Sequence, residues 1–241
     1  MGRDKALSYA SNPELWLTSV SVTIACIALI VLIGYNLSDK NKSFFTKFLG
    51  VLFFVRFIFL HGYMVGLGHW DILNSLPLHL CGISSLVIIF IMFKYNQSMY
   101  EYLVLLGIPS AIHSILTPQF INGWDGYYFP EFYLSHGAIL LAPLYLSINY
   151  GYKLRISSWM TAFRNGLILT LFIGLINLTI DYFYGMMPNY LYLCQAPIAE
   201  NPLLFTTQWP YYFFVLVAFM FIHIIIIYYI FKLIGKVEIS E

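Results

Sequence analysis

Long apolar segments alternate with short polar ones along the whole 241-residue chain. A membrane-spanning helix needs about 20 mostly apolar residues, because the hydrocarbon core of a bilayer is about 30 Å thick. The pattern predicts seven such helices, at residues 15–35, 44–65, 76–94, 99–117, 128–150, 160–183 and 210–232. We therefore expect an all-α polytopic helix bundle that forms a single transmembrane domain over residues 1–241.

The composition supports a membrane protein. The chain is 60% hydrophobic and only 10% charged, whereas about a quarter of the residues of a soluble domain are charged. Its net charge of +1 argues against a nucleic-acid partner, which normally selects a basic surface. Residues 1–13 are polar and mildly charged, unlike a cleavable signal peptide. Membrane lipids are the partners we expect.

Basic residues in the short loops predict the orientation. The expected cytoplasmic loops and ends contain Lys40, Lys42, Lys47, Lys94, Lys153, Arg155, Arg164, Lys232 and Lys236. The opposite side has only Arg3 and Lys5. The N-terminus is therefore expected outside and the C-terminus in the cytoplasm. The plasma membrane of a bacterium is the expected location.

With this topology, polar side chains of five predicted helices reach the depth of the outer leaflet. They are Arg56, His61, His79, Cys81, Ser110, His113, Ser114, Glu131, Ser135, His136, Asn177 and Asp181. The inner half has little comparable, namely Glu101 and His223. Intramembrane ionisable groups normally face the bundle interior and pair with one another. The pattern predicts a polar cavity that opens toward the outer leaflet.

The helix predicted at 160–183 shows directly which face points inward. Gly166, Thr170, Gly174, Asn177 and Asp181 recur at helical spacing on one face. Asp181 and Glu131 are both candidate partners for Arg56, and a structural ion pair is an alternative to a functional one. We assign Arg56, Asn177, Asp181 and Glu131 as candidate substrate-binding residues.

The segment from Asn74 to Gly82 places an imidazole and a thiol at the start of the third predicted helix. Pro77 suits a first helical turn, where its missing N–H is not needed. His79 and Cys81 are about 200° apart around a regular helix, so they do not share a face there. Cys81 therefore needs either an irregular first turn or a histidine from another helix, and we favour His136 or His113.

A cysteine becomes a nucleophile when a base or a positive field favours its thiolate. The hypothesis is a lipid acyltransferase in which Cys81 carries a fatty acyl group as a thioester at outer-leaflet depth. The candidate catalytic residues are Cys81, His136, His113 and His79. The alternative for each is structural: a small residue packed between helices for Cys81, and interhelical hydrogen bonds for the histidines.

Several motifs resemble those of the YwaF-like bacterial integral membrane proteins. They are Leu76-Pro77-Leu78-His79-Leu80-Cys81, Leu116-Thr117-Pro118, Phe132-Tyr133-Leu134-Ser135-His136-Gly137 and Asn189-Tyr190-Leu191-Tyr192-Leu193-Cys194 with the following Ala196-Pro197 and Pro202-Leu203. Trp209-Pro210-Tyr211 matches that family's Pro-Trp-Pro-Trp-Tyr run in part. That family is similar to the transmembrane protein 164 group, whose animal members are described as phospholipid acyltransferases that work through a cysteine. The resemblance implies that role for Cys81, with His136 as the best match for a catalytic histidine.

Two other classes of function stay open. His61, His79, His113 and His136 also permit a metal or haem site, although no single helix has a suitably spaced histidine pair, and we expect no metal and no cofactor. Arg56, Glu131 and Asp181 permit a permease or binding protein. A Cys81–Cys194 disulfide is compatible with the topology, but nothing in the spacing requires it. Cys26 has no evident polar partner.

Overall fold

The computed structural model describes residues 12–118, 120, 126–197 and 204–238. Arg3, Lys5 and the Pro202-Leu203 pair lie outside the described residues. The described part is helical and contains no strand; its backbone pairing outside helices includes an isolated parallel bridge between Leu154 and Val237.

The helices follow the hydrophobic pattern closely. They are α1 (Pro13–Asn36), α2 (Asp39–Gly66), α3 (Leu80–Phe93), α4 (Gln97–Tyr102), the π-helical turn η2 (Leu103–Gly107), α5 (Ile108–Leu116), α6 (Tyr128–Asn149), α7 (Ser158–Tyr184), the 3₁₀ turn η3 (Tyr190–Tyr192) and α8 (Tyr211–Leu233). Since α4, η2 and α5 form one interrupted helix, they correspond to a single predicted span. Five spans, namely α1, α2, the helix Gln97–Leu116, α7 and α8, are long and apolar enough to cross a membrane. The prediction of an all-α membrane bundle is confirmed.

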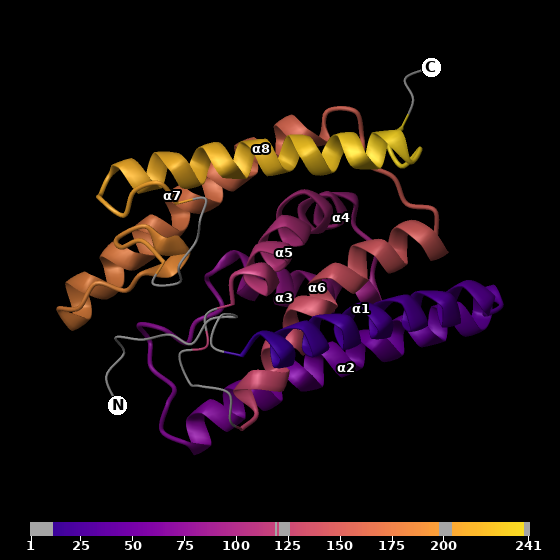
Figure 1. Ribbon diagram of the computed structural model, residues 1–241, viewed down its shortest axis with the longest axis horizontal. Coiled ribbons are helices and arrows are strands. Elements are labelled where there is room, and N and C mark those ends of the chain that lie inside the picture. Colours follow the sequence, from indigo (N-terminus) through magenta and orange to yellow (C-terminus); the bar gives the residue numbers. More distant parts are fainter. Residues whose placement is uncertain (1–11, 119, 121–125, 198–203, 239–241) are drawn as a thin grey trace.

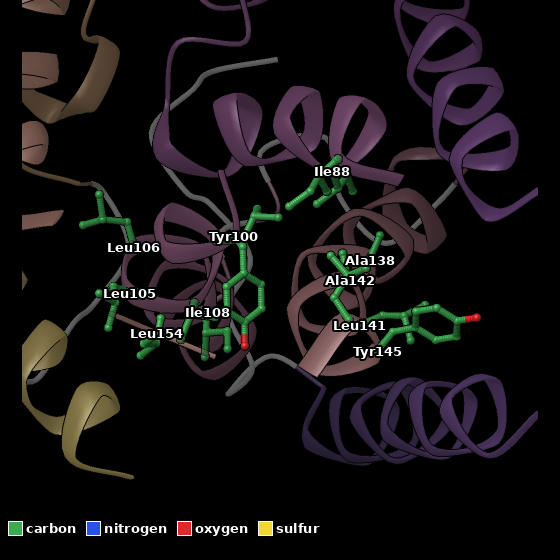
Figure 2. Close-up of a cluster of buried hydrophobic side chains, with 14 of the residues drawn as sticks. Ile88, Tyr100, Leu105, Leu106, Ile108, Ala138, Leu141, Ala142, Tyr145 and Leu154 are labelled. Atoms are coloured by element: carbon green, nitrogen blue, oxygen red, sulfur yellow. The ribbon is translucent and has the colours of Figure 1, made fainter. Parts of the chain in front are cut away.

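The bundle is arranged in three groups of helices (Figure 1). The interrupted helix α4–η2–α5 lies with α3 and α6 in the middle, α1 and α2 lie on one side, and α7 and α8 lie on the other. Tyr100, Leu105, Ile108 and Ala142 belong to the buried cluster that joins the central helices (Figure 2). Apolar residues cover the outer faces of α1, α7 and α8, as expected where lipid replaces water.

The kink predicted at Gly107-Ile108-Pro109 is present and takes the form of a π-helical turn. Proline cannot donate a backbone hydrogen bond, and its ring clashes with the carbonyl four residues earlier. The wider turn η2 ends at Gly107, two residues before Pro109, and accommodates both effects. The hydroxyl of Ser110 donates to the carbonyl of Gly107 at 2.8 Å, which satisfies one acceptor in this turn.

The third span begins later than predicted, and Pro77 is not in its first turn. Helix α3 starts at Leu80, with His79 as its N-cap residue in an extended conformation. The preceding segment folds back on the helix, because a Cβ atom on Gly82 would lie 2.8 Å from the backbone of Pro77. Only glycine permits this approach. Consequently Cys81 falls in the first turn of α3.

The connection after α7 folds into the bundle instead of lying wholly at its surface. Tyr190 is fully buried; its hydroxyl donates to the carbonyl of Ile72 at 2.7 Å and accepts from the N–H of Leu76 at 3.0 Å. Leu191 and Tyr192 both have positive φ, at 56° and 55°, which non-glycine residues rarely adopt. Such strain persists where surrounding contacts enforce it, and it is concentrated near functional sites.

Candidate functional site

A cavity of about 550 Å³ lies between the central helices, α7 and α8. Its volume is in the range of small-molecule sites. Its polar lining includes His79, Cys81, Ser110, His113, Ser114, His136, Thr170, Tyr192 and His223. Apolar residues of η2, α8 and the connection between α7 and α8 form most of the remaining wall. The structure therefore brings all four candidate catalytic residues to one cavity.

Cys81 and His136 are in direct contact inside this cavity. The thiol of Cys81, on α3, is hydrogen-bonded to the imidazole of His136, on α6. The Nδ1 atom of His136 lies 2.6 Å from the carbonyl oxygen of Phe132. Because a carbonyl can only accept, Nδ1 carries the proton in the neutral ring, and Nε2 is left as the basic nitrogen for the thiol.

Two serines of α5 complete the surroundings of the thiol. The Oγ atom of Ser114 lies 3.5 Å from the sulfur of Cys81, and Ser110 interacts electrostatically with the same thiol. The first-turn N–H groups of a helix have no intrahelical acceptor, and the side chain of His79 does not cap those of α3. A helix N-terminus favours negative charge. The site can therefore stabilise a thiolate by hydrogen bonds and by the field of α3.

A second histidine pair lies in the same cavity. The Nε2 atoms of His113 and His223 are 2.8 Å apart, and Nδ1 of His223 lies 2.6 Å from the carbonyl oxygen of Phe219. The expectation that His223 belongs to a different level of the bundle is wrong. The two imidazole side chains together span the distance between α5 and the middle of α8. The depth of each residue, counted along its own helix, therefore does not predict that the two rings meet.

His79, the N-cap residue of α3, lines the cavity and contacts two tyrosines there. Its ring contacts Tyr190 and Tyr192, with ring centroids 5.6 Å and 5.0 Å apart. Tyr192, whose backbone has a positive φ, therefore contacts the N-cap residue of α3. Tyr192 also interacts electrostatically with Cys81.

Arg56 pairs with Glu131 and not with Asp181. The pair is almost completely buried, with side-chain exposures of 10% and 6%. The hydroxyl of Tyr127 donates to the second carboxylate oxygen of Glu131 at 3.1 Å. Neither Arg56 nor Glu131 lines the cavity. Glu131 nevertheless interacts electrostatically with His136 on the same helix.

Asn177 and Asp181 face the segment that follows α7. The amide of Asn177 donates to the carbonyl of Tyr190 at 3.1 Å, and Asp181 interacts with Cys194. Of the predicted small and polar face of α7, Gly166 and Thr170 line the cavity. The end of this face that contains Asn177 and Asp181 is covered by the segment after α7. Helical periodicity alone does not predict this contact.

Of the four histidines proposed for a metal or haem site, His79, His113 and His136 line the cavity and His61 lies apart from them. His61 does not line the cavity, and its ring packs on Phe57 of its own helix. Within the described ranges, no group of three or more histidine, cysteine or acidic residues has a geometry suited to a metal ion. Cys26, Cys81 and Cys194 are free thiols.

The sequence pattern places Ser110 and Ser114 at the cavity without linking them to Cys81, and it assigns no role at the site to His223 or Tyr192. A signal for the serines is present, since Ser110, His113, Ser114 and Thr117 recur at spacings of three and four on one face of α5. No comparable signal marks His223, which is surrounded by apolar residues in sequence.

The chain was compared with known proteins. A family model described as the TMEM164 family matches residues 7–228. No curated protein and no solved structure matches the chain. The matched residues extend from the N-terminal segment into α8 and include every residue of the Cys81 site. This multi-pass membrane protein therefore belongs to the TMEM164 family.

Proposed function

We propose that the protein is a lipid acyltransferase that works through a thioester on Cys81. The observation that carries the proposal is the contact between the Cys81 thiol and a histidine whose Nδ1 is held by a backbone carbonyl. This is the arrangement of nucleophile, base and orienting group required for nucleophilic catalysis. The mostly apolar cavity beside it suits an acyl chain.

The first half-reaction transfers the acyl group to the enzyme. The proton of Cys81 moves to Nε2 of His136, and the thiolate attacks the ester carbonyl of a donor glycerolipid. The tetrahedral intermediate collapses, the carbon–oxygen bond breaks, and the leaving alkoxide takes the proton from His136. The products are a lysolipid and the Cys81 thioester. The second half-reaction transfers the acyl group to the hydroxyl of an acceptor and restores the thiol.

The remaining candidates act around this pair. Arg56 of α2 and Glu131 of α6 form a charged pair near His136, and Asn177 with Asp181 positions the connection that covers the cavity. His79 and His113 are auxiliary residues on the cavity wall. Membrane lipids are both donors and acceptors, and the plasma membrane of a bacterium is the proposed location.

The proposal is tested by incubating the purified protein with phosphatidylcholine labelled in its acyl chains. Wild type should release lysophosphatidylcholine and incorporate label into added lysophosphatidylethanolamine. Cys81→Ser should abolish both products, and His136→Gln should slow them by about 10²–10⁴-fold, the usual contribution of a general base. Cys194→Ser is the matched control and should retain activity. Equal product formation by wild type and Cys81→Ser would contradict the proposal.

A further inference from the structure

The hydrogen bonds of the second histidine pair determine where its protons lie. Nδ1 of His223 lies 2.6 Å from the carbonyl of Phe219, which can only accept, so this nitrogen carries the proton. Nε2 of a neutral His223 is then an acceptor. It lies 2.8 Å from Nε2 of His113, which must therefore donate. In the neutral pair, Nδ1 of His113 is the free basic nitrogen.

The pair lies beside the nucleophile on a different wall of the cavity. Ser114, next to His113 in sequence, contacts the sulfur of Cys81 at 3.5 Å. Ser110, three residues before His113 and thus on the same face of α5, interacts electrostatically with that sulfur. His136 approaches from α6 and His113 from α5, so two separate bases border one reaction centre.

We propose that His113 is the general base for the acceptor, and that His223 is a positioning residue that fixes its tautomer. The inference rests on the proposed function. It separates the two half-reactions: His136 activates Cys81 against the donor, whereas His113 activates the hydroxyl group of the acceptor, a lysophospholipid, against the thioester.

The step balances without a further reactant. The acceptor hydroxyl gives its proton to Nδ1 of His113, and its oxygen attacks the thioester carbonyl. The carbon–sulfur bond of the intermediate breaks, and an ester forms. The thiolate of Cys81 leaves and recovers the proton from His113, which restores the resting thiol and the neutral histidine pair. During this step His113 shares its Nε2 proton with His223, so the positive charge spreads over both rings.

The two half-reactions can be measured separately. The full-length protein is loaded from phosphatidylcholine in mixed micelles, and the thioester is quantified by intact mass. Lysophosphatidylethanolamine is then added and the loss of the thioester is followed. His113→Leu should load like wild type but discharge about 10²–10⁴-fold more slowly, the usual effect of removing a general base.

Variants of His223 distinguish positioning from packing. Glutamine can accept the hydrogen bond from Nε2 of His113 through its amide oxygen, but leucine cannot. His223→Gln should therefore discharge faster than His223→Leu, while both load normally. His113→Leu combined with His223→Leu should be no slower than His113→Leu alone. His69→Gln is the matched control, because His69 is exposed and bonded to Tyr128 outside the cavity.

Two results would overturn the inference while leaving the thioester mechanism in place. One is wild-type discharge by a normally loaded His113→Leu variant. The other is a parallel decrease of loading and discharge in every variant of the pair, including His223→Gln, which would indicate packing alone. Absence of loading in the wild type would instead contradict the proposed function itself.

Discussion

At the residue scale, we expect the loss of either charge of the buried pair Arg56–Glu131 to destabilise the protein strongly. Each charge of a buried pair is stabilised by its partner because water is excluded. Removing one partner leaves the other charge uncompensated and typically costs about 3–5 kcal/mol of folding free energy. Nη1 of Arg56 donates to Glu131, and Nε and Nη2 have no hydrogen-bond partner among the described residues, so Glu131 is the acceptor we find for this guanidinium.

We predict that Glu131→Gln lowers the free energy of unfolding by about 3 kcal/mol or more, measured by thermal unfolding in detergent. The double variant Arg56→Met with Glu131→Leu should be much less destabilised, because it removes both charges. Asp39→Asn is the matched control: Asp39 is fully exposed and 3.8 Å from Lys42, so its loss should have no measurable effect. An equally small effect of Glu131→Gln would refute the argument.

Cys194 illustrates how surroundings set the reactivity of a thiol outside the helices. Burial and the nearby carboxylate of Asp181 raise the pKa of Cys194 above its ordinary value. Less thiolate is then present at neutral pH, and the thiolate is the reactive form. We predict that Cys194 reacts with iodoacetamide more slowly than a free cysteine at pH 7, and that Asp181→Asn increases the rate by lowering the pKa. Peptide mapping measures this rate, and an unchanged or lower rate in Asp181→Asn would contradict the assignment.

At the element scale, the contact between α1 and α6 depends on a missing side chain. A Cβ atom on Gly34 would lie 2.4 Å from the ring of Tyr145 and 2.7 Å from the amide of Asn149. Both neighbours are buried, so they have little room to move, and overpacking of this kind costs about 1–3 kcal/mol.

We predict that Gly34→Ala destabilises the protein by about 1–3 kcal/mol. Gly62 is the matched control within α2, because nothing lies within 4 Å of the position of its Cβ atom. Gly62→Ala should be neutral or stabilising by up to about 1 kcal/mol, since alanine favours helix formation. Chemical unfolding in detergent measures both, and similar effects at the two sites would show that α1 and α6 are not in close contact.

At the scale of the whole molecule, the basic residues collect at one end of the bundle. The ammonium of Lys42 donates to the carbonyl of Asn149 at 3.3 Å, and that of Lys236 donates to the carbonyl of Ser147 at 2.7 Å. The start of α2, the end of α6 and the segment after α8 therefore meet at the same end. From the positive-inside rule we propose that this end is cytoplasmic.

The orientation predicts which positions a membrane-impermeant maleimide reaches in intact cells. In a background with Cys26→Ala, Cys81→Ser and Cys194→Ala, a cysteine introduced by Met187→Cys should be labelled without lysis. One introduced by Lys40→Cys should be labelled only after lysis. Both positions are exposed and lie at opposite ends of the bundle. The reverse pattern would invert the topology.

Features determined by local pattern are predictable from the sequence. The seven predicted helices, the irregular turn before Pro109 and the inward position of Cys81 depend on hydrophobic periodicity and proline chemistry. The structure has a helix or an interrupted helix in each predicted region, and five of these are long and apolar enough to span a membrane. Depth comparison also selects His136 and His113 as the histidines near Cys81, because topology alone aligns their helices.

Features that depend on contacts between distant segments are not predictable in this way. Arg56 pairs with Glu131 and not with Asp181. This pairing depends on how α6 and α7 are rotated about their own axes, which a sequence pattern does not determine. The late start of α3 depends on Pro77 folding over Gly82. The segment after α7 is held against the cavity by the hydrogen bond from the Tyr190 hydroxyl to the carbonyl of Ile72, which is 118 residues away in sequence. Such contacts set the site's final geometry but have no local signal.

The central claim is that Cys81 carries an acyl group, and intact mass measurement with and without neutral hydroxylamine tests it most directly. The wild-type protein, purified from native-like membranes, should show a fatty-acyl mass increment that hydroxylamine removes. Cys81→Ser should lack the increment, whereas Cys194→Ser should retain it. A hydroxylamine-sensitive adduct that persists in Cys81→Ser would contradict the account, because the thioester would then lie on Cys26 or Cys194.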